Sequence, residues 1–185
     1  LQEAGKKVLV LEAEAVGSGQ TGGTTAKITS QHGMIYEYLT RKFGPAKSRQ
    51  YAVANQAAIE EYDRIIREQA IACDFRRCPA YLYALEGSDA GHRMERLKEE
   101  ISAASALGIP AELAQATELP FPIAGAEVFA NQAMFHPMKF LLSLAAKLPV
   151  YEFSKAQRVQ DNCVFTKEGR AEAPAIVFAV HYPWM

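Results

Sequence analysis

The sequence predicts a mixed α/β (α+β) fold, and three patterns carry this prediction. Residues 6–12 (KKVLVLE) have a continuous apolar interior and end in a glutamate, which is typical of a strand covered on both faces by helices. Residues 46–70 place apolar side chains at helical spacing and predict a long amphipathic helix. Residues 80–86 alternate tyrosines with aliphatic residues and predict a strand, and residues 126–134 predict another.

The other elements are predicted from turn and capping signals. Residues 15–33 are rich in Gly, Ser, Thr and Gln, which predicts a loop that runs into a short helix near Thr24–Ser30. Asp89 is a suitable N-cap for a helix that ends at Gly108, and Pro137 suits the first turn of a further helix. The C-terminal part predicts short strands at 150–154, 157–161, 163–166 and 175–180.

Composition excludes several classes of function. The 20 basic and 21 acidic residues nearly cancel and form no basic stripe, so nucleic acid is not an expected partner. The longest apolar runs, such as AIVFAV at 175–180, are far too short to span a membrane. The three cysteines form no C-x-x-C pair, which fits neither a disulfide framework nor a zinc site. We therefore expect a cytoplasmic protein with reduced cysteines and no metal site.

The two ends of the sequence predict a fragment of a larger protein. The chain opens without methionine on LQEAGKK, where LQEAG resembles the last turn of a helix and Gly5 its αL stop. It closes on HYPWM, directly after the apolar run at 175–180.

The stretch GSGQTG at 17–22 matches the dinucleotide pattern G-x-G-x-x-G and allows two interpretations. If it were the fingerprint itself, it would follow a strand at once and lead into an amphipathic helix, with an acid about 20 residues further on. Instead, Ala13–Val16 separate it from the strand, and the polar, β-branched residues that follow do not favour a helix. Direct NAD binding through GSGQTG is therefore the weaker alternative.

The sequence fits the dinucleotide-binding pattern better if the glycine fingerprint lies one strand–helix unit earlier than GSGQTG. LQEAG is then the end of the fingerprint's helix, KKVLVLE is the second strand, and Glu12 is the acid at its tip. A carboxylate in this position accepts hydrogen bonds from both ribose hydroxyls and repels a 2′-phosphate. The alternative is that Glu12 is a solvated strand end beside a merely flexible loop.

The segment LQEAGKKVLVLEAEAVGSGQTGGTTAKITSQHG resembles the D-amino-acid-oxidase-type family of FAD-dependent oxidoreductases, which includes amine, glycine and sarcosine oxidases. It is most similar to a bacterial subgroup whose members often carry a C-terminal Rieske iron–sulfur domain. The resemblance implies a partial Rossmann-like FAD-binding domain with an inserted substrate-domain portion. Its FAD-binding parts would lie at 1–36 and 150–185, with the helical and substrate-domain part at 37–149. The match is strong over the first 36 residues, moderate over 125–185, and limited to the order of elements between them.

The resemblance also implies which residues face FAD. Glu12 would bind the adenosine ribose, and the glycine loop would pass the pyrophosphate and reach the flavin ring. Small residues let backbone approach a flat ring, and hydroxyls and amides donate hydrogen bonds to phosphate and flavin oxygens. The residues implied toward the phosphates are Ser18, Gln20 and Thr21, and those toward the isoalloxazine are Thr24, Thr25, Ala26 and Lys27.

A second part of the resemblance is the segment KAQRVQDNCVFTKEGRAEAPAIVFAVHYP near the C-terminus. Its first strand would present a backbone N–H and C=O to adenine at Val159. Its last strand would return to the nucleotide sheet and end beside the cofactor, from Ala179 to Pro183. The family usually has Ala-Thr-His or Ala-Thr-Gly where this chain has Ala179-Val180-His181, so the hydroxyl of that contact is missing.

Catalytic residues stay unassigned, with Lys27, His32 and His181 as candidates. Flavin amine oxidation needs little from side chains, because the flavin N5 accepts a hydride from the carbon next to nitrogen and the protein supplies orientation. The alternatives are a surface lysine for Lys27 and capping or supporting roles for both histidines. The doublet Arg76-Arg77 suits either a substrate carboxylate or a solvated surface.

These observations leave three hypotheses open. The first is a fragment of an FAD-dependent oxidoreductase that transfers a hydride from a C–N bond of an amine or amino acid and is inactive by itself. The second is a non-catalytic truncated remnant that acts as a structural or interaction module and self-associates through an exposed sheet edge. The third is an intact NAD-binding protein.

Overall fold

The computed structural model describes residues 1–180, and the chain divides into two compact units. One unit consists of Leu1–Gly23 with Leu141–Met185, and the other of Thr24–Phe140. The prediction of a mixed α/β fold is confirmed, since helices and both parallel and antiparallel strands are present. The domain division at 1–36, 37–149 and 150–185 stays a prediction.

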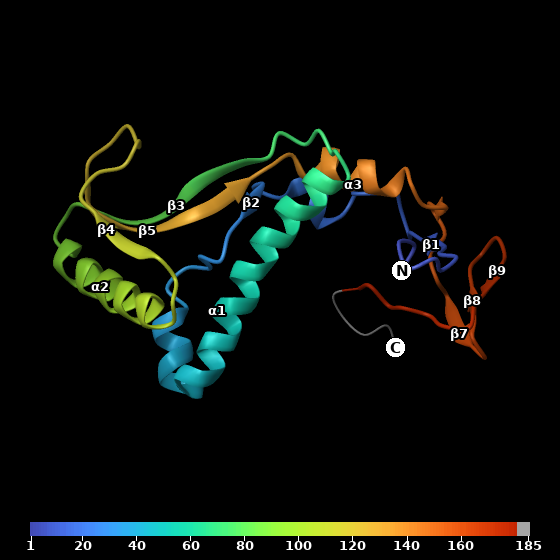
Figure 1. Cartoon of the computed structure of the whole chain (residues 1–185), viewed down its shortest axis with the longest axis horizontal. Coiled ribbons are helices and arrows are strands. Elements are labelled where there is room, and N and C mark those ends of the chain that lie inside the picture. The colour runs from blue at the N-terminus through green and yellow to red at the C-terminus, as the bar shows by residue number, and fades with distance from the viewer. Residues whose placement is uncertain (181–185) are drawn as a thin grey trace. The chain divides into compact units, whose positions relative to one another are not determined.

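The unit Thr24–Phe140 is built on an antiparallel sheet with β5 (Ile123–Met134) at its centre (Figure 1). β3 (Arg76–Leu85) pairs with β5 along one edge. β2 (Lys27–Ile28) and β4 (Ala111–Ala114) pair with two separate stretches of β5. Because a strand has only two edges and β3 occupies one, β2 and β4 share the other.

Two helices lie on the same side of this sheet (Figure 1). α1 (Tyr36–Glu68) is broken at Gly44, whose φ of 78° and ψ of 163° are not helical, and Pro45 follows at once. α2 (Ala90–Ala106) ends where Gly108 takes a φ of 94°. The helices and β5 enclose a core cluster of Tyr36, Ala52, Ala104, Leu107, Ile109, Ala111 and Phe129. A second cluster contains Ile28, Ile59 and Ala133.

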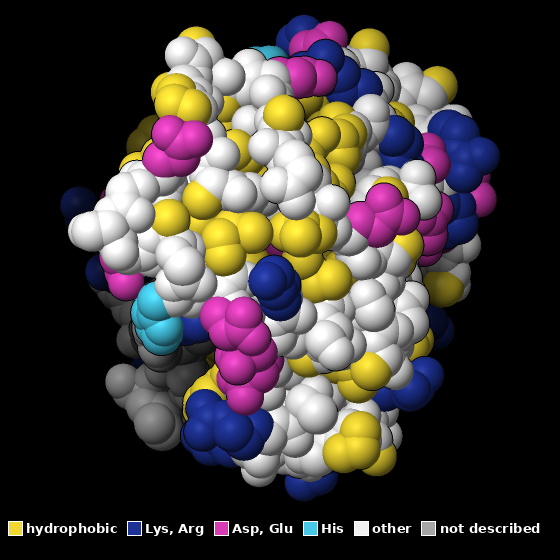
Figure 2. Space-filling view, turned by 90° about the vertical axis from the view of Figure 1, so that its left-hand side faces the viewer, with side chains coloured by type: hydrophobic (Ala, Val, Ile, Leu, Met, Phe, Trp, Pro, Cys, Tyr) yellow, Lys and Arg dark blue, Asp and Glu magenta, His cyan; other side chains and the backbone are white. Residues whose placement is uncertain are grey.

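Hydrophobic side chains also reach the surface of this unit. Seen from the left-hand side of Figure 1, they gather in the middle of the face, with charged side chains around them (Figure 2). The ring centroids of Tyr83 and Phe121 lie 5.8 Å apart. The exposed large hydrophobic residues of β3, β4 and the loop before β5 are Tyr81, Tyr83, Leu85, Leu113, Leu119 and Phe121.

The other unit contains a parallel strand pair and a small antiparallel sheet. β1 (Val10–Leu11) pairs in parallel with β6 (Val150–Tyr151). A 3₁₀ turn, η1, spans Gln20–Gly23. β7 (Arg158–Gln160), β8 (Cys163–Phe165) and β9 (Arg170–Glu172) form a sheet in that order. α3 (Pro137–Ala145) lies between β5 and β6 in the chain and begins at the predicted proline.

Two predicted elements are wrong. The predicted short helix near Thr24–Ser30 is absent, and the segment contains the strand β2 instead, because Lys27 and Ile28 pair with Met134 and Ala133 of β5. The predicted strand at 175–180 is absent from the described residues, and Val177 and Val180 are 74% and 59% exposed. An apolar run becomes a strand only where another strand pairs with it, and the sheet formed by β1 has only β6 in the described part of the chain.

Candidate cofactor-binding site

Glu12 lies at the carboxyl end of the parallel pair. Its backbone N–H donates to the Tyr151 carbonyl at 2.9 Å, and its carbonyl accepts from the Ser154 N–H at 2.8 Å. Its half-buried carboxylate accepts a hydrogen bond from the Glu14 N–H at 2.9 Å, which turns the chain out of the strand. Ligands of parallel sheets bind just beyond the carboxyl ends of the strands, so Glu12 is where the sequence predicts a ribose contact.

Carboxylates hold the start of the glycine loop. Glu152, one residue after β6, accepts a hydrogen bond from the Val16 N–H at 2.6 Å. The Ser18 hydroxyl lies 3.3 Å from a Glu14 carboxylate oxygen. Gly17 has a φ of 81°, a conformation that glycine adopts most readily. The loop therefore leaves the strand in a fixed direction, and the Ser18 hydroxyl is held by Glu14.

The rest of the glycine loop is exposed to solvent. Ser18, Gln20 and Thr21 are exposed. A Cβ added at Gly19 or Gly23 would meet no heavy atom of the chain within 4 Å. The packing of the chain therefore does not require glycine at these two positions. Open glycines beside exposed hydroxyl and amide groups fit close backbone approach by an anionic group such as a pyrophosphate.

The segment predicted to face the isoalloxazine begins the other unit. Thr24 and Thr25 are exposed and Ala26 is half-buried. Ala26 has a φ of 64°, which an L residue other than Asn or Asp seldom adopts, while its carbonyl accepts from the Phe135 N–H at 3.3 Å. Left-handed backbone at an alanine is held only where the surroundings impose it, and it often marks a functional segment.

Lys27 is the first residue of β2 and is exposed. It lies opposite Met134, whereas the next pair, Ile28 and Ala133, packs with Ile59 of α1. Side chains alternate between the two faces of a sheet, so Lys27 projects from the face opposite α1. Neither α1 nor α2 covers that face of the sheet (Figure 1).

The histidine candidates are placed differently. His32 is exposed, and its Nδ1 lies 2.9 Å from the Tyr51 hydroxyl of α1. His32 is thus tied to α1, whereas Lys27 projects from the opposite sheet face. His181 lies outside the described residues.

Val159 lies in the middle of β7, at the edge of the small sheet. Asp161–Asn162 connect β7 to β8 with φ values of 50° and 60°, the signature of a two-residue type I′ turn. In such a hairpin the flanking pair, Gln160 and Cys163, is the hydrogen-bonded one, so the next pair, Val159 and Val164, is not. The N–H and C=O of Val159 therefore point off the outer edge of β7. Ala179, in contrast, is exposed and lies in no strand.

A buried polar cluster was missed by the sequence reasoning. Glu100 of α2 accepts hydrogen bonds from the Tyr36 and Glu37 N–H groups at 2.7 and 2.8 Å, at the start of α1. Glu127 of β5 accepts from the Gln31 amide at 3.2 Å, while its other oxygen is buried without a partner. Burial, and then the charge of Glu100, raise the pKa of Glu127 to about 8. The sequence feature that could have pointed to Glu100 and Glu127 is that each is a glutamate among apolar residues of its helix or strand.

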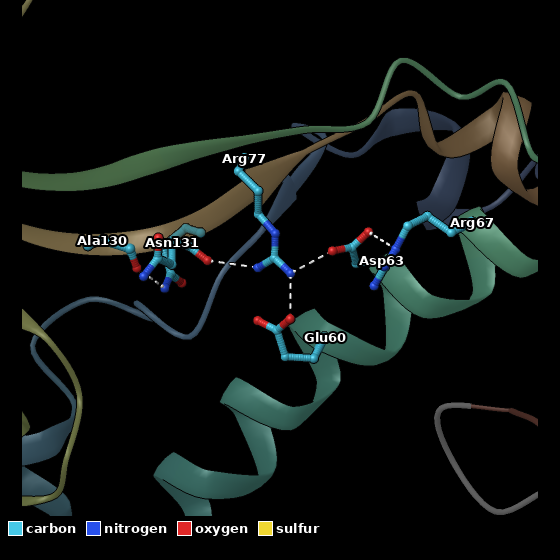
Figure 3. Close-up of polar contacts among 7 residues, drawn as sticks. Glu60, Asp63, Arg67, Arg77, Ala130 and Asn131 are labelled. Atoms are coloured by element: carbon cyan, nitrogen blue, oxygen red, sulfur yellow. Dashed lines mark hydrogen bonds and ion pairs between the residues drawn. The ribbon is translucent and has the colours of Figure 1, made fainter.

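The Arg76-Arg77 doublet is not free to bind a substrate carboxylate as a pair. Arg77 points from β3 toward α1, where it contacts Glu60 at 2.7 Å and Asp63 at 3.0 Å (Figure 3). It also donates to the Asn131 carbonyl at 3.0 Å. The hydrogen bond from Arg77 lowers the pKa of Asp63 below its usual value. Arg77 therefore ties α1 to the two longest strands of the sheet.

Residues 1–180 contain neither a candidate membrane span nor a candidate metal site. None of the helices there is long and apolar enough to cross a membrane. Within the same range, no group of three or more His, Cys, Asp and Glu side chains is arranged to hold a metal ion.

Several known proteins are similar to this chain in sequence or in fold. The family model described as "FAD dependent oxidoreductase" (DAO) matches residues 1–182. YhfW of Bacillus subtilis (strain 168), named as a Rieske 2Fe-2S iron-sulfur protein, is 34% identical over 179 residues. That match covers 96% of this chain and 33% of YhfW, so the chain spans about a third of that relative's length.

Solved structures add the likeness in fold. L-proline dehydrogenase from P. horikoshii matches with a TM-score of 0.67 and 16% identity, over 92% of this chain and 45% of that one. Glycine oxidase from Geobacillus kaustophilus matches with a TM-score of 0.65 and 16% identity, over 94% and 48%. L-amino acid deaminase from Proteus vulgaris matches with a TM-score of 0.60 and 14% identity, over 91% and 40%.

Proposed function

The chain belongs to the DAO family of FAD-dependent oxidoreductases, and from this premise we propose that it supplies cofactor-facing parts of an enzyme that oxidises a C–N bond of an amine or amino acid. The observation that carries the proposal is Glu12 at the tip of a parallel pair, followed by glycines that the chain's own packing does not require. A carboxylate and an open loop in this order are what an adenosine ribose and a pyrophosphate need.

Each group of residues has its own task in this proposal. Glu12 accepts hydrogen bonds from the ribose hydroxyls, and Ser18, Gln20 and Thr21 lie along the phosphates. The outward N–H and C=O of Val159 suit the paired donor and acceptor of an adenine edge. Thr24, Thr25, Ala26 and Lys27 face the flavin ring, where the lysine places a positive charge. Bound FAD supplies the acceptor for a hydride from the carbon next to the substrate nitrogen.

The substrate class is proposed from the similar proteins. Their names include a glycine oxidase, an L-proline dehydrogenase and an L-amino acid deaminase, all of which act on amino acids. A small amine or amino acid is therefore the proposed substrate. Arg77 is engaged with Glu60 and Asp63, so this proposal does not use it to bind the substrate carboxylate.

We expect the 185-residue chain by itself to bind FAD weakly and to show no turnover. The residues before β1 contain a single glycine, Gly5, and no G-x-G-x-x-G turn. That turn supplies the backbone N–H groups that hold a pyrophosphate in Rossmann-like folds. The glycine loop after Glu12 would then act on FAD without the strongest phosphate contacts of the fold.

A non-catalytic module is the second candidate, and one observation favours it. β1 has a single described partner, β6, and the neighbouring Leu9 is 44% exposed. A parallel strand with an uncovered edge is a surface for association.

The test is titration of the ¹⁵N-labelled chain with FAD, FMN and NAD, followed by amide chemical shifts, which detect weak binding. We expect FAD to shift the amides of Ser18–Lys27 and Val159. Glu12→Ala should weaken FAD binding but leave FMN unchanged, because FMN lacks the adenosine ribose. Glu168→Ala, in the exposed turn after β8, is the matched control.

Three results would count against the proposal. FAD could cause no shifts at high concentration, or NAD could cause larger shifts than FAD, which would favour direct use of GSGQTG. If Glu12→Ala weakened the binding of FAD and of FMN equally, Glu12 would not bind the adenosine ribose.

A further inference from the structure

Ser30 lies at the centre of a buried hydrogen-bond cluster directly after β2. Its N–H donates to the Gln132 side-chain oxygen at 2.7 Å, and its carbonyl accepts from the Tyr36 hydroxyl at 2.7 Å. Its hydroxyl accepts from the Gln56 amide at 3.0 Å. Ser30, Tyr36, Gln56 and Gln132 together form what we name the Ser30 clamp. It joins the chain after β2 to both α1 and β5.

Gln132 has the central part in the clamp. Its side chain is 1% exposed, and its oxygen also accepts from the Thr29 and Ser30 hydroxyls at 3.0 and 3.3 Å. Its amide nitrogen donates to the Ala130 carbonyl at 2.9 Å. The amide group supplies both an acceptor for the Ser30 backbone and a donor for the Ala130 carbonyl. Buried polar groups satisfied in this way fix one arrangement of the chain.

The clamp holds a segment that would otherwise be weakly fixed. β2 has only two residues, which a pair of strands alone holds poorly. Just before it, Ala26 keeps a left-handed φ of 64° that the surroundings must impose. Because the chain is continuous, fixing Thr29 and Ser30 fixes the course of the residues immediately before them. These are Thr24–Lys27, the segment assigned to the flavin ring.

We propose that Gln132 is a positioning residue for the cofactor, which acts through Ser30 to hold Thr24–Lys27 in the conformation that faces the isoalloxazine. This inference rests on the proposed function, because the proposed function supplies the ligand of that segment. Gln132 itself does not touch the cofactor. Its role is to remove the freedom that Thr24–Lys27 would otherwise lose on binding.

The test compares Gln132→Leu, which removes the acceptor, with Gln132→Glu, which keeps an accepting oxygen. Arg77→Leu is the matched control, since it breaks the bond to the Asn131 carbonyl on the same strand without touching Ser30. Gln56→Leu removes a single bond to the Ser30 hydroxyl and replaces Gln132→Leu if that variant does not fold. Two readouts are needed, namely amide hydrogen exchange without ligand and FAD-induced amide shifts.

In the absence of FAD, the Ser30 amide should exchange about 10- to 100-fold faster in Gln132→Leu, because its buried acceptor is gone. Gln132→Glu should retain most of the protection, and Arg77→Leu should leave it unchanged. With FAD, Gln132→Leu should lose the shifts of Thr24–Lys27 and keep those of Ser18–Thr21.

Unchanged exchange of the Ser30 amide in Gln132→Leu would overturn the clamp. Faster exchange with intact FAD shifts at Thr24–Lys27 would leave the clamp in place and overturn its positioning role. If the unmodified chain showed no FAD shifts at all, the proposed function would fail and the positioning role with it. The exchange comparison would still decide the clamp, so the two failures can be told apart.

Discussion

At the scale of single residues, the glycines divide into those that the fold needs and those that it does not. Gly44 and Gly108 have φ values of 78° and 94°, which L side chains rarely adopt, so the kink of α1 and the end of α2 require them. Gly19 and Gly23 have neither a positive φ nor a close neighbour. The packing of this chain therefore does not explain glycine at these two positions, whereas a bound cofactor would.

Alanine at Gly19 or Gly23 should therefore leave stability unchanged or slightly raised, by at most about 1 kcal/mol, because it lowers the entropy of the unfolded chain. The same variants should weaken FAD binding, since the added methyl group occupies the space that the phosphates approach. Gly169→Ala, which also meets no heavy atom within 4 Å, is the control and should change stability by a similarly small amount without weakening FAD binding. Urea unfolding and the FAD titration measure the two effects. Loss of stability without loss of FAD binding would show that the loop serves the fold alone.

Glu127 should make the chain less stable as the pH rises. Its pKa is raised from 4.5 to about 8 in the folded chain, while in the unfolded chain it stays near 4.5. Between these values the unfolded chain has lost the proton that the folded chain still holds. The contribution is thus fully present below pH 4.5 and is lost as the pH rises to about 8, with a slope of up to about 1.4 kcal/mol per pH unit.

Glu127→Gln should flatten this slope, because glutamine stays neutral at every pH. The slope should not vanish, since burial also raises the pKa of Glu100. The free energy of unfolding, measured in urea between pH 5 and pH 8, tests this, with Glu112→Gln on β4 as an exposed control. An unchanged slope in Glu127→Gln would mean that Glu127 is already ionised in the folded chain.

At the scale of elements, the start of α1 depends on α2. Its N-cap residue is Ile35, which has no side-chain hydrogen bond to offer. The Glu100 carboxylate supplies this cap from α2, where it also meets the positive end of the helix dipole. The short segment before the Gly44 kink is thereby capped by α2, and the longer segment after it meets α2 through Ala52 and Ala104 in the same core cluster.

Glu100→Ala should cost about 2–3 kcal/mol of stability, because it leaves the N–H groups of Tyr36 and Glu37 buried without an acceptor. The kink should confine the local damage, so faster amide exchange is expected over 36–43 and not over 46–68. Glu99→Ala, on the exposed neighbour, is the control. Equal loss of protection on both sides of Gly44 would show that α1 opens as one helix.

Some of the helices and strands can be predicted from the sequence, and others cannot. The second half of α1, together with β3 and β5, follows from the sequence. A long periodic pattern of apolar residues indicates both the type of element and the face that is buried. β2 and β4 were not predicted, since each exists through its pairing with β5. The place of Glu12 at the end of a strand was predicted because it follows from the apolar run before it, and its ribose contact stays a prediction. The role of Gln132 could not be predicted, because its partner Ser30 is 102 residues away.

At the scale of the whole molecule, the sheet of β1 has the strongest consequence. Parallel strands normally lie inside a sheet with both neighbours present, and a lone pair of short strands is marginal in water. β1 has β6 on one side, and the exposed Leu9 adjoins it. An uncovered apolar edge of this kind favours pairing with a second copy of the chain. The prediction of self-association follows from this edge.

The apparent mass of the chain in sedimentation should therefore rise with concentration. Leu9→Lys should shift this association to at least about 10-fold higher concentration, because a charge at a strand edge opposes pairing. Leu142→Lys, at an equally exposed leucine of α3, is the control and should have little effect. Equal effects of both variants would assign association to general surface hydrophobicity. If FAD left the association unchanged and Leu9→Lys left FAD binding intact, the edge and the cofactor site would be separate, and association would not be the function that the glycine loop serves.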